Sequence, residues 1–265
     1  MIQALAKWIL CVALLLCCCA ELQARVAAQS PTIEALYQQG LDAYRAPTPD
    51  LATARAIWTA ALDGAAGESA ARRAQLCKCL GNVAFRQERP LEAAAWFTAA
   101  IGLTPRDRDA WSNLEFARSK AGLEPADRGD LAATFDRVVH ALSLAESEWL
   151  ALGMAMILGA LVCLRAFVLG SAATRPLWVA LVLACLCSLP WIVQSREAAG
   201  DPVFVISTAG VTVASEPRVA AAKVALLSAG ARAQRLEQLA GWMRVETEHG
   251  ERGWMPVDSV LALRR

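Results

Sequence analysis

The sequence has 265 residues, of which 56% are hydrophobic, with a mean hydropathy of +0.37 and a formal net charge of +1. The hydropathy is high for a soluble protein, and the near-zero charge gives no electrostatic basis for binding nucleic acid. The apolar residues concentrate in three stretches, which leaves room for two small folded domains. We therefore expect a multidomain membrane protein.

Residues 1–28 have the features of a secretory signal peptide. A lysine near the start precedes the apolar run Trp8–Ala20, which is too short to span a membrane comfortably, and Val26–Ala28 offers small residues for cleavage. Cys17 raises the alternative of a lipoprotein signal, but Leu16 stands where that signal needs a small residue. An uncleaved membrane anchor is the other alternative.

The next segment, residues 29–147, is alanine-rich and is broken at regular places by Gly and Pro. Its clearest unit has Gly81 followed, after twelve, four, three and five residues, by Ala93, Phe97, Ala100 and Pro105. This spacing is typical of a tetratricopeptide repeat (TPR). The glycine lets two helices approach, the aromatic ring fills the space between units, and the proline ends the second helix. We therefore predict an α-helical TPR solenoid.

The solenoid is expected to contain about three units. In the first, Gly40 and Trp58 correspond to the glycine and the aromatic residue, with a two-residue insertion between them. In the third, Glu115 stands where the repeat usually has Gly, and residues 127–141 are expected to supply the closing helix. The predicted units are residues 33–66, 74–107 and 108–141.

A stack of this kind has no catalytic apparatus, and its concave face typically binds an extended peptide or a partner helix. On this face Lys78, Asn82 and Asn113 resemble part of the carboxylate clamp of chaperone-binding TPR domains, where Lys and Asn hold the C-terminal carboxylate of a peptide. The remaining basic pair of that clamp has no counterpart, and the alternative is a plain solvated face. The candidate partner-binding residues are Tyr37, Tyr44, Lys78, Asn82, Arg86, Asn113, Phe116 and Lys120.

Two further apolar runs, residues 148–169 and 176–194, are each close to the length that crosses a bilayer. The short link between them, residues 170–175, predicts a transmembrane hairpin. Arg165 and Arg175 lie at the link and would place it in the cytoplasm by the positive-inside rule. Both flanking domains would then face the periplasm from a bacterial inner membrane. The alternative is a buried helical pair in a soluble protein.

Residues 200–265 change to short β-rich runs separated by turn signals. They include a Trp-x-x-Val strand, from Trp242 to Val245, and a Gly-Trp-Met-Pro strand that contains Trp254 and ends at Pro256. This segment resembles a bacterial SH3 (SH3b) domain, a small five-stranded all-β barrel. We expect Val245 and Val257 to point inward and the two tryptophans to pair across adjacent strands. The tryptophans are the candidate SH3b surface, for peptide or peptidoglycan, unless they are packing residues.

Motifs for catalysis are absent from the sequence: there is no Gly-x-Ser-x-Gly, no phosphate-binding loop with Lys, no His-Glu-x-x-His and no Cys-x-x-Cys. We expect a non-enzymatic protein without cofactor or metal, in which His140 and His249 are inert. Cys77 and Cys79 are two positions apart on a predicted helix and point about 200° away from each other. We therefore expect no disulfide between them and a packing role for Cys77.

The order of signal peptide, TPR stack, two-helix hairpin and SH3b domain resembles the BatE proteins of the Bat (aerotolerance) operons over nearly the whole chain. The resemblance implies partners with von Willebrand factor A domains and, indirectly, a MoxR-type AAA+ ATPase. It also implies a role in oxidative-stress tolerance and envelope integrity, but it supplies no active-site residues. We expect an inner-membrane scaffold for Bat partners; the alternative is an envelope sensor that binds peptidoglycan through the SH3b domain.

Overall fold

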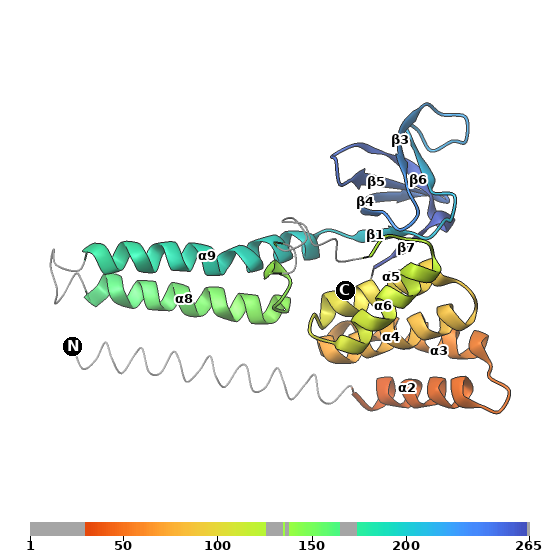
Figure 1. The fold of residues 1–265 in the computed structure, drawn as a ribbon, viewed down its shortest axis with the longest axis horizontal. Helices are drawn as coiled ribbons and strands as arrows, with labels where there is room; N and C mark the ends of the chain where they lie inside the picture. The colour runs from red at the N-terminus through yellow and green to blue at the C-terminus, as the bar shows by residue number, and fades with distance from the viewer. Residues whose placement is uncertain (1–29, 126–134, 136–137, 165–173, 264–265) are drawn as a thin grey trace.

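The computed structural model describes residues 30–125, 135, 138–164 and 174–263. Figure 1 shows three parts: a group of short helices, two long helices that lie side by side, and a β-sheet domain. The predicted signal peptide and Arg165 lie outside the described residues, as does most of the predicted link.

The first part consists of five α-helices, each packed against the next in sequence. Side chains define where several of them begin, because Asp50, Ser69 and Asp107 each accept a hydrogen bond from a backbone N–H in the first turn of the following helix. The helices are α2 (Ser30–Arg45), α3 (Leu51–Gly64), α4 (Ala70–Arg86), α5 (Pro90–Leu103) and α6 (Arg108–Lys120), with a 3-10 turn η1 (Ala65–Gly67) after α3.

The same kind of packing contact, between a glycine and an aromatic ring, occurs inside each of the hairpins α2–α3 and α4–α5. A Cβ atom added to Gly81 would lie 2.7 Å from Cε1 of Phe97, and one added to Gly40 would lie 2.3 Å from Nε1 of Trp58. Both aromatic side chains are almost completely buried. The predicted close approach of two helices at each glycine is therefore confirmed. The predicted second helix of the third unit falls mostly outside the described residues.

The second part contains α8 (Leu144–Leu164) and α9 (Thr174–Ala199), which pack against each other. Each carries a 21-residue span, with mean hydropathies of 1.9 and 2.1, and only 6% and 11% of their most apolar windows are buried. Both helices are thus long and apolar enough to cross a membrane. Arg175, predicted in the link, lies in the first turn of α9.

Polar contacts tie the base of the two long helices to the segment before them. Gln194 of α9 donates from Nε2 to the carbonyl oxygens of Val139 (2.6 Å) and Leu142 (3.1 Å). Arg106, in the loop before α6, pairs with Glu146 of α8 at 2.9 Å. The start of α8 and the end of α9 therefore lie together at the end of the hairpin next to the helical domain (Figure 1).

The third part is one antiparallel sheet of seven strands in the order β3-β2-β6-β5-β4-β1-β7. The sequence predicts five strands. Strand β4 has the sequence Arg-Ala-Gln-Arg-Leu-Glu-Gln-Leu, which has no strand-like pattern. It forms a strand because pairing with β1 and β5 overrides its local preference. The strands are β1 (Pro202–Val205), β2 (Val211–Ala214), β3 (Lys223–Leu227), β4 (Arg232–Leu239), β5 (Trp242–Thr247), β6 (Arg252–Pro256) and β7 (Val260–Ala262), with a 3-10 turn η4 (Val257–Ser259) before β7.

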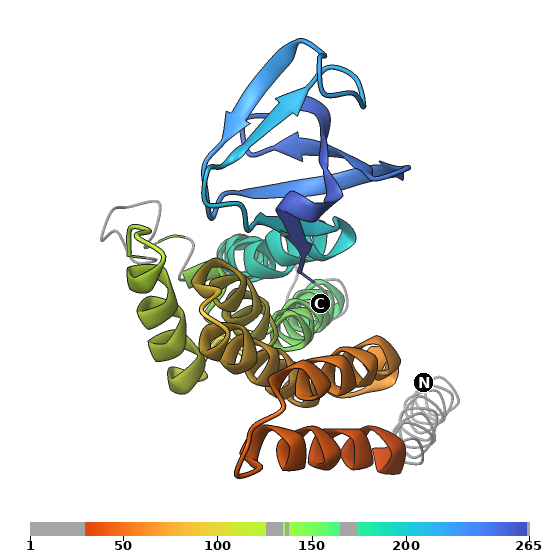
Figure 2. The same cartoon turned by 90° about the vertical axis from the view of Figure 1, so that its right-hand side faces the viewer.

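Strand β1 is buried on both faces because it lies between two cores. Val203 and Val205 pack in the core of the sheet together with Val245, whose predicted inward direction is confirmed. Phe204 of β1 and Leu263 after β7 instead belong to the apolar cluster of the helical domain. Figures 1 and 2 show the sheet on one side of the helices, with β1 and β7 nearest to them. The sheet is therefore docked on the helical domain through buried apolar side chains.

The contact between Gly81 and Phe97 predicts the effect of adding one methyl group. Gly81→Ala should lower the free energy of unfolding by about 1–3 kcal/mol, because the new Cβ overpacks against the ring, although alanine favours the helix. Urea unfolding of the detergent-solubilised protein, followed by far-UV circular dichroism, measures the change. Gly153→Ala in α8 is the control, since nothing lies within 4 Å of that position. An unchanged unfolding midpoint for Gly81→Ala would contradict this packing.

Candidate functional site

Helices α2, α4 and α6 contribute side chains to one hollow of about 310 Å³. These are the first helices of successive units, so the hollow lies on the face that the sequence predicts for partner binding. It contains five of the eight predicted residues, together with six that the sequence does not predict. The lining residues are Tyr37, Leu41, Tyr44, Arg45, Trp58, Gln75, Lys78, Cys79, Asn82, Asp109 and Asn113.

Tyr37 is held in place by three neighbours. Its hydroxyl accepts a hydrogen bond from Nε2 of Gln75 (2.7 Å), its carbonyl oxygen accepts one from Nε1 of Trp58 (3.2 Å), and the guanidinium of Arg72 lies 5.6 Å from its ring centroid. Burial raises the pKa of the Tyr37 hydroxyl, so the group stays protonated at neutral pH. These contacts set the position of the Tyr37 side chain at this part of the hollow.

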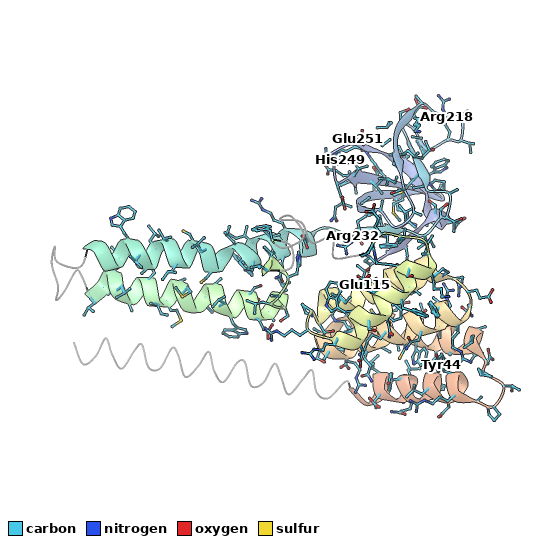
Figure 3. The ribbon with its side chains drawn as sticks, in the orientation of Figure 1. Tyr44, Glu115, Arg218, Arg232, His249 and Glu251 are labelled. Carbon is cyan, nitrogen blue, oxygen red and sulfur yellow. The ribbon has the colours of Figure 1, made fainter. Side chains whose placement is uncertain are left out.

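Tyr44 forms an aromatic edge of the hollow near the end of α2 (Figure 3). Its ring lies 5.7 Å from that of Trp58, tilted by 47°. The guanidinium of Arg86, from α4, lies 4.7 Å from the Tyr44 ring centroid and donates to the Tyr44 carbonyl oxygen at 3.3 Å. Arg86, also predicted, therefore flanks the hollow and links α4 to α2.

Lys78 makes an internal ion pair instead of remaining open to a ligand. Its Nζ lies 2.6 Å from Oδ2 of Asp107, whose Oδ1 accepts from the backbone N–H groups of Asp109 and Ala110 at the start of α6. Burial acts to raise the pKa of Asp107, but the hydrogen bond from Lys78 and the backbone donors outweigh it and lower the pKa. The structure therefore gives no support to a carboxylate clamp at Lys78.

Asn82 and Asn113 line the hollow from α4 and α6 with half-buried side chains. In the described part of the chain, neither side-chain amide has a hydrogen-bond partner. Each amide offers a donor and an acceptor, the same pair that a peptide group presents. These two residues are therefore available to bind the backbone of an extended segment.

The two remaining predicted residues lie at the edge of the face. The ring of Phe116, 55% exposed, lies 5.1 Å from that of Phe85. The ammonium of Lys120 lies 5.8 Å from the Phe116 ring centroid. They do not line the hollow but extend its face along α6.

The two tryptophans of the sheet lie on its outer face but do not face each other directly. The register places Trp242 opposite Pro256, and Trp254 opposite Arg244, so the rings occupy diagonal positions. The predicted cross-strand aromatic pair is therefore wrong, because the pairing is offset by one step of two residues. Both side chains are half-buried, which gives each ring a packing contact and an accessible edge.

The described residues contain no group of three or more His, Cys, Asp or Glu side chains that could hold a metal ion. His140 contacts Glu197 at 2.9 Å near the base of the long helices, and His249 lies in the turn between β5 and β6 (Figure 3). Cys77 and Cys79 are both free and buried. The residues that line the hollow offer hydrogen bonds, aromatic surface and charge for binding a ligand.

One residue of the hollow that is not among the predicted residues, Arg45, has a signal in the sequence that the repeat pattern could have revealed. Arg45 follows Gly40 by five residues, as Arg86 follows Gly81. Gln75 has no such signal, because its role depends on the distance between its side chain and a tyrosine on another helix.

Comparison with known proteins gives no assignment: no family model matches the sequence, and none of the curated proteins or solved structures matches the chain. The function must therefore be argued from the geometry described above.

The ion pair between Lys78 and Asp107 predicts a pH-dependent stability. Because the pKa of Asp107 is lowered in the folded protein, the pair contributes stability above the ordinary pKa of 3.8 and loses it as the pH falls through the folded-state pKa. Lys78→Met should lower the free energy of unfolding at pH 7 by about 1 kcal/mol, and this effect should shrink progressively as the pH falls below 3.8. Urea unfolding across this range tests it, with exposed Lys223→Met as the control. An effect independent of pH would contradict it.

The two buried cysteines should be unreactive in the folded protein. Burial raises the pKa of Cys77 to about 12 and that of Cys79 to about 11, so almost no thiolate is present at pH 8. We expect iodoacetamide to label neither residue in native protein and both in urea, as located by peptide mass spectrometry. Fast native labelling of Cys79 would show that the hollow opens more widely than the structure indicates.

Proposed function

We propose that the protein is a non-enzymatic, membrane-anchored scaffold whose helical domain binds an extended segment of a partner protein. The observation that carries the proposal is the pair of unpartnered amides, Asn82 and Asn113, which face a hollow beside fixed aromatic side chains. A peptide that enters the hollow can exchange its backbone hydrogen bonds with water for bonds to these amides. The face combines this polarity with the apolar surface of Tyr37 and Tyr44.

The two long helices support a membrane anchor. Their apolar side chains are largely exposed, with Trp149 at 68% and Trp178 at 63%, and an exposed surface of this kind is unfavourable in water. A bilayer would cover it. Because both ends of the hairpin lie beside the helical domain, the helical domain and the sheet would then occupy one side of the membrane. We propose the periplasmic side of a bacterial inner membrane, as the predicted signal peptide and Arg165 suggest.

We propose that the helical solenoid is a TPR domain and the sheet an SH3b-like domain, and that the chain acts in a Bat-type system. The repeated contact of a glycine with an aromatic ring in α2–α3 and α4–α5 supports the first assignment. Partners with von Willebrand factor A domains then follow from the resemblance noted above. We assign partner binding to the helical domain because the β1–β7 side of the sheet is already buried against it.

Site-specific photo-crosslinking in living cells tests this function. A photoreactive amino acid placed at Asn113 should crosslink to a membrane protein with a von Willebrand factor A domain, whereas the same amino acid at Ala56, exposed on α3 outside the hollow, should not. The double variant Asn82→Ala/Asn113→Ala should weaken binding of that partner by about thirty-fold, and lower its co-purification accordingly, since each amide contributes about 1 kcal/mol and about 1.4 kcal/mol is ten-fold. Undiminished co-purification would overturn the proposal.

A further inference from the structure

Three cations occupy the same repeat position at the ends of α2, α4 and α6. Arg45, Arg86 and Lys120 each lie in the last turn of their helix. They follow Gly40, Gly81 and Glu115 by five residues in each case (45 − 40, 86 − 81 and 120 − 115). We call them the cation row. Positive charge at a helix C-terminus favours the helix dipole, but the dipole does not require one repeat position.

No member of the cation row has a carboxylate partner among the described residues, which it has in common with Arg73 and Arg108 but not with the paired cations of the helical domain. The members of the row instead contact aromatic rings or the hollow: Arg86 lies over Tyr44, Lys120 lies over Phe116, and Arg45 lines the hollow. The paired cations are Arg55 and Arg89 with Glu92, Arg72 with Glu34, Lys78 with Asp107, and Arg106 with Glu146. The row is therefore a strip of uncompensated positive charge beside the hollow.

Positive and negative side chains lie at opposite ends of the helices that form the hollow. Asp109, at the start of α6, is the one carboxylate in the lining of the hollow, and it lies at the opposite end of α6 from Lys120. In Figure 1, α2 and α6 end on the side of the helical domain away from α8 and α9. The row therefore faces away from the bilayer that the long helices would cross, so lipid headgroups of that bilayer do not reach it.

We propose that the cation row selects an acidic segment of the partner protein, one that lies extended across the ends of α2, α4 and α6. The inference rests on the proposed function, because it names the chemistry of the peptide that the hollow binds. Side chains of α4 reach those of α2 and α6, since Arg86 lies over Tyr44 and the ring of Phe85 lies 5.1 Å from that of Phe116. An extended chain rises about 3.3 Å per residue, so a carboxylate at every third residue recurs about every 10 Å and can meet the cations of the row in turn.

The test uses the full chain in nanodiscs and a fluorescein-labelled peptide of twelve residues with Glu at every third position. A second peptide has Gln at the same positions. Fluorescence anisotropy should show about ten-fold tighter binding of the Glu peptide at low salt, and the difference should shrink as salt rises. Each of Arg45→Gln, Arg86→Gln and Lys120→Gln should weaken binding of the Glu peptide by about two- to five-fold and leave the Gln peptide unchanged.

Lys223→Gln is the matched control, because it removes the same charge from an exposed position on β3. Equal binding of the two peptides, or an equal loss with Lys223→Gln, would overturn the inference and leave the peptide-binding function standing. Failure of both peptides to bind would also overturn it. The proposed function fails separately, through undiminished partner capture by the Asn82→Ala/Asn113→Ala variant. Unchanged circular dichroism of the variants shows that they remain folded.

Discussion

The close approach of a glycine to an aromatic ring sets the spacing of the helical domain. At Gly81 and Gly40 a single methyl group would overlap Phe97 and Trp58, so each hairpin closes to a separation that no other residue allows. Once α2–α3 and α4–α5 have the same spacing, their first helices come to lie side by side. The hollow exists because these helices present their side chains to one shared face.

The second constraint is that β1 is buried on both sides. A strand with Phe204 on one face and Val203 and Val205 on the other cannot be exposed on either face without exposing apolar surface to water. The sheet is therefore held against the helices instead of moving as a separate module. Together with the contacts of Gln194 at the base of the hairpin, this gathers both folded parts at one end of α8 and α9.

Much of the fold follows from local sequence. The spacing of glycine, alanine and aromatic residues specifies contacts within one hairpin, and an unbroken apolar run specifies each long helix. What the sequence does not predict depends on distant partners. Strand β4 forms because β1 and β5 supply its hydrogen bonds, and Lys78 meets Asp107 across 29 residues. The offset of Trp242 from Trp254 likewise depends on a register that is set by the turn and not by the tryptophans themselves.

The charged residues of the helical domain fall into two groups: those that pair with each other and hold the helices together, and those that are available to bind a ligand. Glu92 is buried and joins Arg55 of α3 to Arg89 before α5, so its charge is already satisfied and holds the units together. Arg86 is exposed, has no carboxylate partner in the part of the chain that the structure describes, and is oriented by an aromatic ring. Its position is thus fixed before a ligand arrives, which reduces the entropy lost on binding. A scaffold requires a binding face whose polar groups are oriented but not yet paired, next to a core whose charges are already paired. Such a face can bind a partner without breaking any contact within the protein.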